Sequence, residues 1–285
     1  MRKIILPLLA LTMSVLAQVK VAGAEHHEGL SAILAAQPDE AKARYKYRHP
    51  QETLDFFDIQ PGMTVVDTLP GSVWYTGVLL SYLGPDGAVI GADYPSDMWA
   101  QFGYDEEFLA TKKNWAKDWT ATAETWRDDD SAGVSAFVLG SLPESMHGSA
   151  DVVLFVRALH NMVYTSPDAR NLSTAIENAY DVLKPGGIVG VVQHQARDNM
   201  PDSWADGEMG YLKKAYVIET MEAGGFQFVA ESAVNENSKD MPTTEEYVWR
   251  LPPSYDGADT PEAKAKVDAI GESNRMTLKF RKPQD

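Results

Sequence analysis

The chain has 285 residues, no cysteine and a formal net charge of −16 at pH 7. The absence of cysteine excludes disulfides, thiolate catalysis and zinc–sulfur sites. The negative charge argues against a nucleic-acid partner, because a polyanion would be repelled. Acidity can also simply keep an exported protein soluble. We therefore expect a small-molecule partner, and the sequence predicts no oligomeric state and no metal site.

The first 24 residues have the pattern of a cleavable signal peptide. The basic pair Arg2-Lys3 precedes an apolar stretch, residues 4–16, that is too short for a comfortable membrane span. Ala22-Gly23-Ala24 supplies a small-x-small cleavage pattern, so the mature protein is expected to begin at Glu25. An uncleaved signal anchor is the alternative. The pattern predicts a bacterial periplasmic or secreted protein with one domain over residues 25–285 and no membrane attachment after cleavage.

Helical and strand-like stretches alternate along the mature chain. Residues 25–60 form a helical lead-in, in which a helix over residues 39–57 is kinked or divided at His49-Pro50. Seven short runs predict β-strands, and the first five are continuously apolar, as in parallel strands that are covered on both faces. The strands are expected at residues 64–69, 88–92, 134–139, 152–156, 188–193, 226–234 and 275–281.

Two helices are expected between the later strands. An apolar stripe from Leu172 to Leu183 predicts a helix that ends at Lys184-Pro185-Gly186-Gly187, and a second helix covers residues 213–223. The last two strands have no long helix between them, which predicts an antiparallel hairpin at the sheet edge. Residues 235–273 then form a surface excursion or a lid. This alternation predicts a doubly wound α/β sandwich.

Residues 64–93 read as strand, tight turn, helix and second strand. Asp67 ends the first apolar run, and Asp93 ends the second, 26 residues later. This spacing suits one βαβ unit that holds a nucleoside, with the turn backbone close to the ligand and the distal acid on the ribose hydroxyls. Asp67 could instead form an Asx turn, and Asp93 could cap the helix near Ser96.

Several motifs give the chain a family resemblance. It resembles exported bacterial proteins described as predicted methyltransferases, which have the class I S-adenosylmethionine-dependent methyltransferase fold. That fold is a doubly wound, mostly parallel seven-stranded sheet with a reversed edge strand. The resemblance covers about residues 45–282. The matching segments are YRHPQETLDFF, MTVVDTLPGSVWYT, DVVLFVRALHN, LKPGGIVGVVQHQAR, GYLKKAYVI and GESNRMTLKF.

The resemblance implies an S-adenosylmethionine site. Asp67 would orient the methionine part, Gly71 and Ser72 would form the turn beside it, and Leu142 would pack on the adenine. The three glycine positions of such a turn hold Leu69, Gly71 and Val73 here. Leucine and valine lack the positive-φ freedom of glycine, and the valine methyl groups would occupy ligand space. These departures, and export away from the cytosol, weigh against this cofactor.

Candidate catalytic residues follow the fourth and fifth strands. His160 and Asn161 face the same crevice as Asp67, and His194 ends the fifth strand. A histidine there is a candidate general base, because its free pKa lies near neutral pH. The alternative is a structural histidine that holds the loop. Arg157 could bind a substrate carboxylate bidentately, or it could pair with a surface acid.

Four aromatic residues are candidates for a substrate-binding wall over the pocket. They could equally be ordinary half-buried packing residues. They are Tyr47, His49, Trp74 and Tyr75.

The sequence is compatible with three functions. The first is S-adenosylmethionine-dependent methyl transfer to a small molecule. The second is a non-catalytic periplasmic binding protein on a methyltransferase scaffold, which Leu69, Val73 and the export signal favour. A dehydrogenase ranks last, because a pyrophosphate must approach the turn even more closely than S-adenosylmethionine does.

Overall fold

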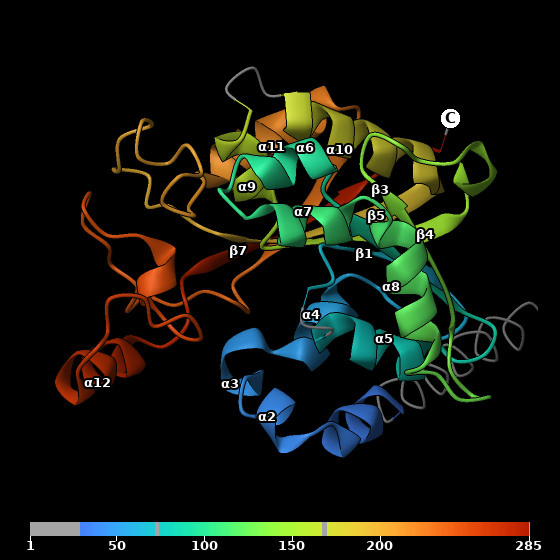
Figure 1. Cartoon of the computed structure of the whole chain (residues 1–285), viewed down its shortest axis with the longest axis horizontal. Coiled ribbons are helices and arrows are strands. Elements are labelled where there is room, and N and C mark those ends of the chain that lie inside the picture. The colour runs from blue at the N-terminus through green and yellow to red at the C-terminus, as the bar shows by residue number, and fades with distance from the viewer. Residues whose placement is uncertain (1–28, 72–73, 167–169, 285) are drawn as a thin grey trace, which may run out of the picture.

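The computed structural model describes residues 29–71, 74–166 and 170–284 (Figure 1). The predicted signal peptide and two residues of the glycine turn, Ser72 and Val73, lie outside the described residues. Within the described part, no helix is long and apolar enough to cross a membrane.

One seven-stranded sheet forms the centre of the protein, with the strand order β3-β2-β1-β4-β5-β7-β6. All neighbouring pairs are parallel except those made by β7, which runs antiparallel to β5 and to β6. The predicted reversed strand is therefore β7, and β6 lies outside it at the edge. The strands are β1 Thr64–Thr68, β2 Ala88–Asp93, β3 Gly133–Val138, β4 Ala150–Val156, β5 Leu183–His194, β6 Gln227–Ser232 and β7 Arg275–Arg281.

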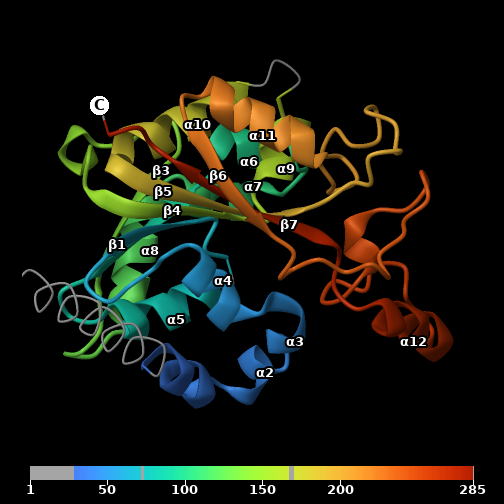
Figure 2. The ribbon, with the colours of Figure 1, turned by 180° about the vertical axis from the view of Figure 1, so that it is seen from behind.

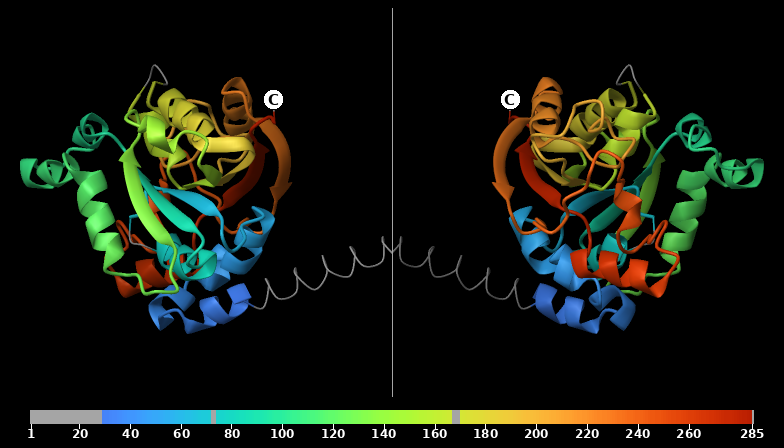
Figure 3. Two further views of the ribbon diagram at one scale, coloured as in Figure 1. Left: turned by 90° about the vertical axis from the view of Figure 1, so that its right-hand side faces the viewer. Right: turned by 90° about the vertical axis from the view of Figure 1, so that its left-hand side faces the viewer.

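Helices cover both faces of the sheet (Figures 1 to 3). Helices α9, α10 and α11 contribute to the core on one face, and α4, α5 and α8 contribute to the core on the other. Residues 29–36 are also helical. The remaining helices are α2 Asp39–Lys42, α3 Tyr45–Arg48, α4 Pro50–Phe56, α5 Trp74–Leu83, α6 Ser96–Ala100, α7 Glu106–Lys112, α8 Trp115–Glu124, α9 Leu159–Tyr164, α10 Arg170–Val182, α11 Lys214–Ala223 and α12 Pro261–Ile270, with short 3₁₀ turns at Glu144–Met146 and Val248–Arg250.

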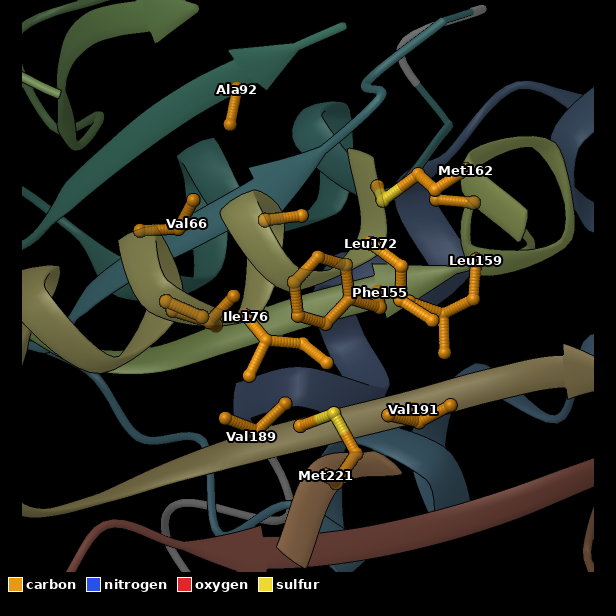
Figure 4. Close-up of a cluster of buried hydrophobic side chains, with 14 of the residues drawn as sticks. Val66, Ala92, Phe155, Leu159, Met162, Leu172, Ile176, Val189, Val191 and Met221 are labelled. Carbon is orange, nitrogen blue, oxygen red and sulfur yellow. The ribbon is translucent and has the colours of Figure 1, made fainter. Parts of the chain in front are cut away.

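The larger core lies between the sheet and the α9–α11 layer (Figure 4). Phe155 and Val189 project from the sheet toward Ile176 of α10 and Met221 of α11, and each of these side chains is at most 2% exposed. Alternate residues of the central strands supply the core on the opposite face, because successive side chains of a strand point to opposite sides. This double burial explains the continuously apolar strand sequences.

Two local signals in the sequence have clear structural counterparts. His49 has a φ of 38° and separates α3 from α4, and Pro50 occupies the first turn of α4, so the predicted helix over residues 39–57 is divided at His49-Pro50. The apolar stripe forms α10, which ends at Val182. β5 begins directly afterwards, within the predicted helix stop.

Candidate functional site

A cavity of about 270 Å³ lies at the carboxyl ends of β1, β4 and β5. Ligands of open α/β sheets bind outside the carboxyl ends of the strands, so this is the expected place for a site. Polar, charged and aromatic side chains line the cavity together. The lining residues are Arg48, Asp67, Thr68, Leu69, Pro70, Gly71, Trp74, Tyr75, Val156, Arg157, His160, Asn161, His194 and Trp249.

The turn after β1 forms one wall of this cavity. Leu69 and Gly71 have φ values of 56° and 47°, so the leucine adopts the left-handed conformation that a glycine would adopt at lower cost. The Leu69 amide donates to the Ala92 carbonyl over 2.7 Å, which holds the turn against β2. The Thr68 hydroxyl oxygen is buried and has no hydrogen-bond partner among the described residues. A buried polar group normally has a partner, so this hydroxyl is available to a ligand.

Asp67 lies under the same wall and is 3% exposed. The Thr76 hydroxyl donates to its Oδ2 over 2.7 Å. Burial raises the pKa of the Asp67 carboxyl to about 6, and the hydrogen bonds from Thr76 lower it less than burial raises it. Asp67 can therefore change protonation state near neutral pH.

Asp93 lies away from this cavity and already has partners. Its Oδ2 accepts a hydrogen bond from Lys112 Nζ at 2.9 Å, and its Oδ1 accepts one from the Tyr94 amide at 2.9 Å. Lys112 Nζ also lies 3.9 Å from the centre of the Trp99 ring. Burial raises the pKa of Asp93, although Lys112 opposes this shift. The ribose role of Asp93 stays a prediction, and in this structure Lys112 holds the carboxylate that the ribose would need.

A second and larger cavity, of about 530 Å³, lies near the predicted adenine position at the ends of β2 and β3. Leu142 packs against the adjacent core and does not line this cavity. Backbone and small polar groups at Gly140 and Ser141 take that place. Other lining residues are Pro95, Asp97, Met98, Gln101, Leu139, Met162, Thr165, Ser166, Arg170, Asn171 and Thr174.

The two predicted histidines lie side by side at the first cavity. The ring centroids of His160 and His194 are 5.3 Å apart. His160 Nδ1 lies 3.3 Å from the side chain of Gln193, and His194 Nδ1 lies 2.6 Å from Ser273 Oγ. Both rings are buried. Their hydrogen bonds fix the ring orientations toward the cavity.

Burial makes both histidines weak bases. It lowers the pKa of His160 to about 4, against the opposing hydrogen bond from Gln193, and the charge of Arg157 lowers it further. The pKa of His194 lies well below its ordinary value, because of burial and then of His160 and the nearby arginines. A general base works best with a pKa near the operating pH. Neutral imidazoles here are better suited to hydrogen bonding than to proton abstraction.

Asn161 is the third predicted catalytic residue and lies beside His160 in the first turn of α9. Its Nδ2 donates to the Tyr94 hydroxyl over 3.3 Å, and that hydroxyl donates to the Ala158 carbonyl over 2.6 Å. Asn161 therefore connects the cavity wall to the end of β2.

Four arginines surround a single buried glutamate beside the cavity, and we call Arg44, Arg48, Arg157, Arg275 and Glu272 the arginine cluster. Arg44 and Arg48 pair with Glu272 Oε1, the latter at 3.3 Å, and Arg275 pairs with Oε2 at 3.0 Å. Burial acts to raise the pKa of Glu272, but the charges of the arginines lower it below its usual value. Glu272 is therefore ionised.

The four residues of the predicted aromatic wall divide between two cavities, and their role in substrate binding stays a prediction. Trp74 and Tyr75 line the first cavity, and the Arg48 guanidinium lies 4.8 Å from the centre of the Trp74 ring. Tyr47 and His49 instead line a separate cavity of about 280 Å³ that faces residues 235–239. The reason is the end of α3, where the chain turns at His49 and directs Arg48 toward the first cavity.

Four residues at or beside the cavity were not predicted from the sequence: Arg48, Trp249, Glu272 and Arg275. The Trp249 ring centroid lies 5.8 Å from that of His160, so the segment over residues 235–273 contributes to the cavity wall. The motif G-E-S-x-R-M-T-L-K-F contains both Glu272 and Arg275 and was the available signal. The described residues contain no group of three or more side chains that could hold a metal ion.

The sheet order, the reversed β7 and a cavity at the carboxyl ends of β1 and β4 define a class I methyltransferase-like fold. Comparisons with protein-family models and with curated proteins found no match.

Solved structures with a similar chain arrangement include three enzymes. The [4+2]-cyclase SpnF is 18% identical, with a TM-score of 0.49, and the match covers 84% of this chain and 81% of SpnF. A SAM-dependent methyltransferase from Aquifex aeolicus is 18% identical, with a TM-score of 0.43 and coverages of 70% and 93%. The Burkholderia thailandensis 1,6-didemethyltoxoflavin-N1-methyltransferase, solved with 1,6-didemethyltoxoflavin and S-adenosylhomocysteine, is 13% identical, with a TM-score of 0.44 and coverages of 99% and 93%.

Proposed function

We propose that the protein is an S-adenosylmethionine-dependent methyltransferase that acts on a small molecule. The observation that carries the proposal is the cavity beside the β1–α5 turn, in which the Thr68 hydroxyl lacks a partner among the described residues. Asp67 and the first turn of α9 meet at the same place. This is the position at which an open α/β sheet binds its ligand.

The residues at the turn fit the methionine part of the cofactor. Thr68 offers a hydroxyl that has no partner among the described residues, and Leu69 and Gly71 adopt the left-handed conformation expected at glycine positions of such a turn. When bound, the cofactor supplies an electrophilic methyl group. The protein contributes alignment of the acceptor in this cavity, with hydrogen bonds from His160, Asn161 and His194.

The ribose of the cofactor can bind Asp93 only if Lys112 moves away from it. The Asp93 carboxylate is already paired with Lys112, and the residue is only 1% exposed. We propose that Lys112 holds Asp93 in the free protein and moves when the cofactor binds.

A second candidate function is non-catalytic binding of a small molecule on the same scaffold. The Lys112–Asp93 ion pair favours it, because it occupies the ribose acceptor, and Leu69 favours it as a departure from the glycine turn. In that case the first cavity would bind a metabolite without any adenosyl cofactor.

Calorimetric titration with S-adenosylmethionine and S-adenosylhomocysteine separates the two functions. We expect micromolar affinity, and Thr68→Val should weaken it about 3- to 10-fold, as the loss of one neutral hydrogen bond predicts. Thr64→Val is the matched control, because Thr64 begins the same strand at the end remote from the cavity. No binding by folded protein at millimolar ligand would contradict the methyltransferase and favour the binding protein.

We also propose export, which the pattern of residues 1–24 supports. N-terminal sequencing of protein from a periplasmic extract should give Glu25 as the first residue. A mature chain that retains Met1 would contradict cleavage.

A further inference from the structure

The charge of the first cavity has the opposite sign to that of the whole protein. The chain carries a formal net charge of −16. Two arginines of the arginine cluster, Arg48 and Arg157, line the first cavity, and Asp67, the one acid among its lining residues, has a raised pKa of about 6. Arg48 and Arg275 are buried and Arg44 and Arg157 are half-buried, and an excess of positive charge in such surroundings is costly unless an anion compensates it.

Three of the four arginines already have a partner. Arg44, Arg48 and Arg275 share the two oxygens of Glu272, and Arg275 also donates to the Tyr47 carbonyl over 2.5 Å. These contacts hold the cluster in place. They also engage both oxygens of the single carboxylate of the cluster.

Arg157 is the exception. Among the described residues, its guanidinium makes neither a hydrogen bond nor an ion pair, and it lies between the first cavity and a smaller one of about 90 Å³ that Ser273 and Trp249 help to line. Burial lowers the pKa of Arg157 to about 9, and the charges of Arg48 and Arg275 add to this shift, whereas the charge of Glu272 opposes it. An arginine that lies near two other guanidinium groups and has no direct partner of its own is arranged for an anionic ligand.

The backbone holds Arg157 firmly at this position. It directly follows β4, has a φ of 57°, and its amide donates to the Val192 carbonyl over 2.7 Å. A non-glycine residue in the left-handed region is uncommon, and such strain is concentrated at functional sites. The end of β4 therefore holds Arg157 at the cavity in a backbone conformation that costs energy.

We propose that Arg157, assisted by Arg48, binds a carboxylate group of the acceptor substrate in the first cavity. A planar guanidinium matches a carboxylate bidentately. Trp74, Tyr75 and Trp249 line the same cavity and suit a flat apolar body, and the volume of about 270 Å³ suits a small molecule. The assignment of the bound molecule as the methyl acceptor rests on the proposed methyl transfer, whereas the carboxylate site itself does not.

The test uses benzoate as the probe, with inorganic phosphate as the competing anion at constant ionic strength and without cofactor. Calorimetric titration of the natural protein should show benzoate binding that is tighter than phosphate binding. Arg157→Met should weaken benzoate about 10- to 100-fold, because one charge-assisted hydrogen-bond pair is lost. Arg157→Lys keeps the charge but not the planar guanidinium, so its benzoate affinity should lie between those of the natural protein and Arg157→Met. Arg127→Met is the control, because Arg127 pairs with Glu124 at the surface of the protein.

A second measurement separates binding from support of the fold. Arg157→Met should unfold at the same temperature as the natural protein or at a higher one, because it removes repulsion with Arg48 and Arg275. A large fall in that temperature together with weaker binding would show that Arg157 is structural, and would overturn the proposal. Equal benzoate affinity in natural protein and Arg157→Met, no benzoate binding, or tighter phosphate binding would each overturn it as well.

These titrations distinguish a failure of the carboxylate site from a failure of the proposed methyltransferase function. Arg157-dependent benzoate binding without any binding of S-adenosylhomocysteine would keep the carboxylate site and remove the methyltransferase. Loss of benzoate binding at saturating S-adenosylhomocysteine would show that Arg157 serves the carboxylate of the cofactor, and would overturn the acceptor assignment. Benzoate binding that persists at saturating S-adenosylhomocysteine supports both.

Discussion

The Lys112–Asp93 ion pair gives the sharpest prediction about this protein. The two side chains are 13% and 2% exposed, and their 2.9 Å contact occupies the carboxylate that we propose as the ribose acceptor. If Lys112 competes with the ribose for Asp93, then removal of its charge should destabilise the free protein and strengthen binding of the cofactor. Lys112→Met keeps most of the side-chain length and removes the ammonium group.

The two effects have different magnitudes. Breaking a buried ion pair by removal of one partner costs about 3–5 kcal/mol, and the partial exposure of Lys112 places the expected loss at about 3 kcal/mol. The cation–π contact of Lys112 with Trp99 is lost as well. A ligand that no longer has to displace a charge-assisted hydrogen bond of about 1.5–3 kcal/mol should bind about 10- to 100-fold more tightly.

Urea denaturation and calorimetric titration with S-adenosylhomocysteine measure the two effects on the same samples. Lys113→Met is the matched control, because the neighbouring Lys113 is exposed and makes no ion pair among the described residues. The control should change neither quantity. The penalty of Lys112→Met should shrink at low pH, because an unpaired buried Asp93 has a raised pKa and becomes neutral there.

Weaker cofactor binding by Lys112→Met would refute this reasoning, since it would make Lys112 part of the binding site. Stability within 0.5 kcal/mol of the natural protein, about the size of an ordinary surface effect, would show that the ion pair is not a structural contact.

Two further predictions concern the walls of the first cavity. The pKa of Asp67 is raised to about 6 in the folded protein, so between about pH 4 and pH 6 the folded state keeps a proton that the unfolded chain has lost. As the pH rises through this window, the free energy of unfolding of the natural protein should fall by about 3 kcal/mol relative to that of Asp67→Asn. Urea titrations that show no such fall would contradict this prediction. Gly207 has a φ of 96°, and an added Cβ would lie 2.3 Å from the His160 carbonyl oxygen. Gly207→Ala should therefore lower the free energy of unfolding by about 3 kcal/mol in denaturation experiments. Gly103→Ala, at a φ of 76° with no atom within 4 Å, should lose only about 1 kcal/mol, and an equal loss in both variants would rule out the clash.

The sequence alone was sufficient to predict the architecture. Continuous apolar runs marked the parallel strands because both faces of the sheet are buried. The divided helix at His49-Pro50 and the end of α10 followed from backbone preferences, which act locally. The position of β7 between β5 and β6 depends on long-range pairing, and no local pattern distinguished it from an outer edge strand.

The candidate site was predictable only in part. Asp67 and His194 lie in the last residues of strands and Arg157 and His160 come just after one, and the strand-end rule locates such residues from sequence. The partners of Glu272 were not predictable, because Arg44 and Arg48 come from segments 228 and 224 residues away in the chain. Lys112 of α7 reaches Asp93 at the end of β2 from 19 residues away, and no local pattern in the sequence indicated this pair.

The location of cofactor binding tests the central claim most directly. Amide hydrogen exchange of the protein should be measured by mass spectrometry with and without saturating S-adenosylhomocysteine. The account predicts slower exchange in the β1 turn, residues 67–71, and in residues 157–161 after β4, because both segments line the first cavity. Unchanged exchange in both segments, or protection confined to residues around the second cavity, would contradict the assignment of this cavity as the methyltransferase site.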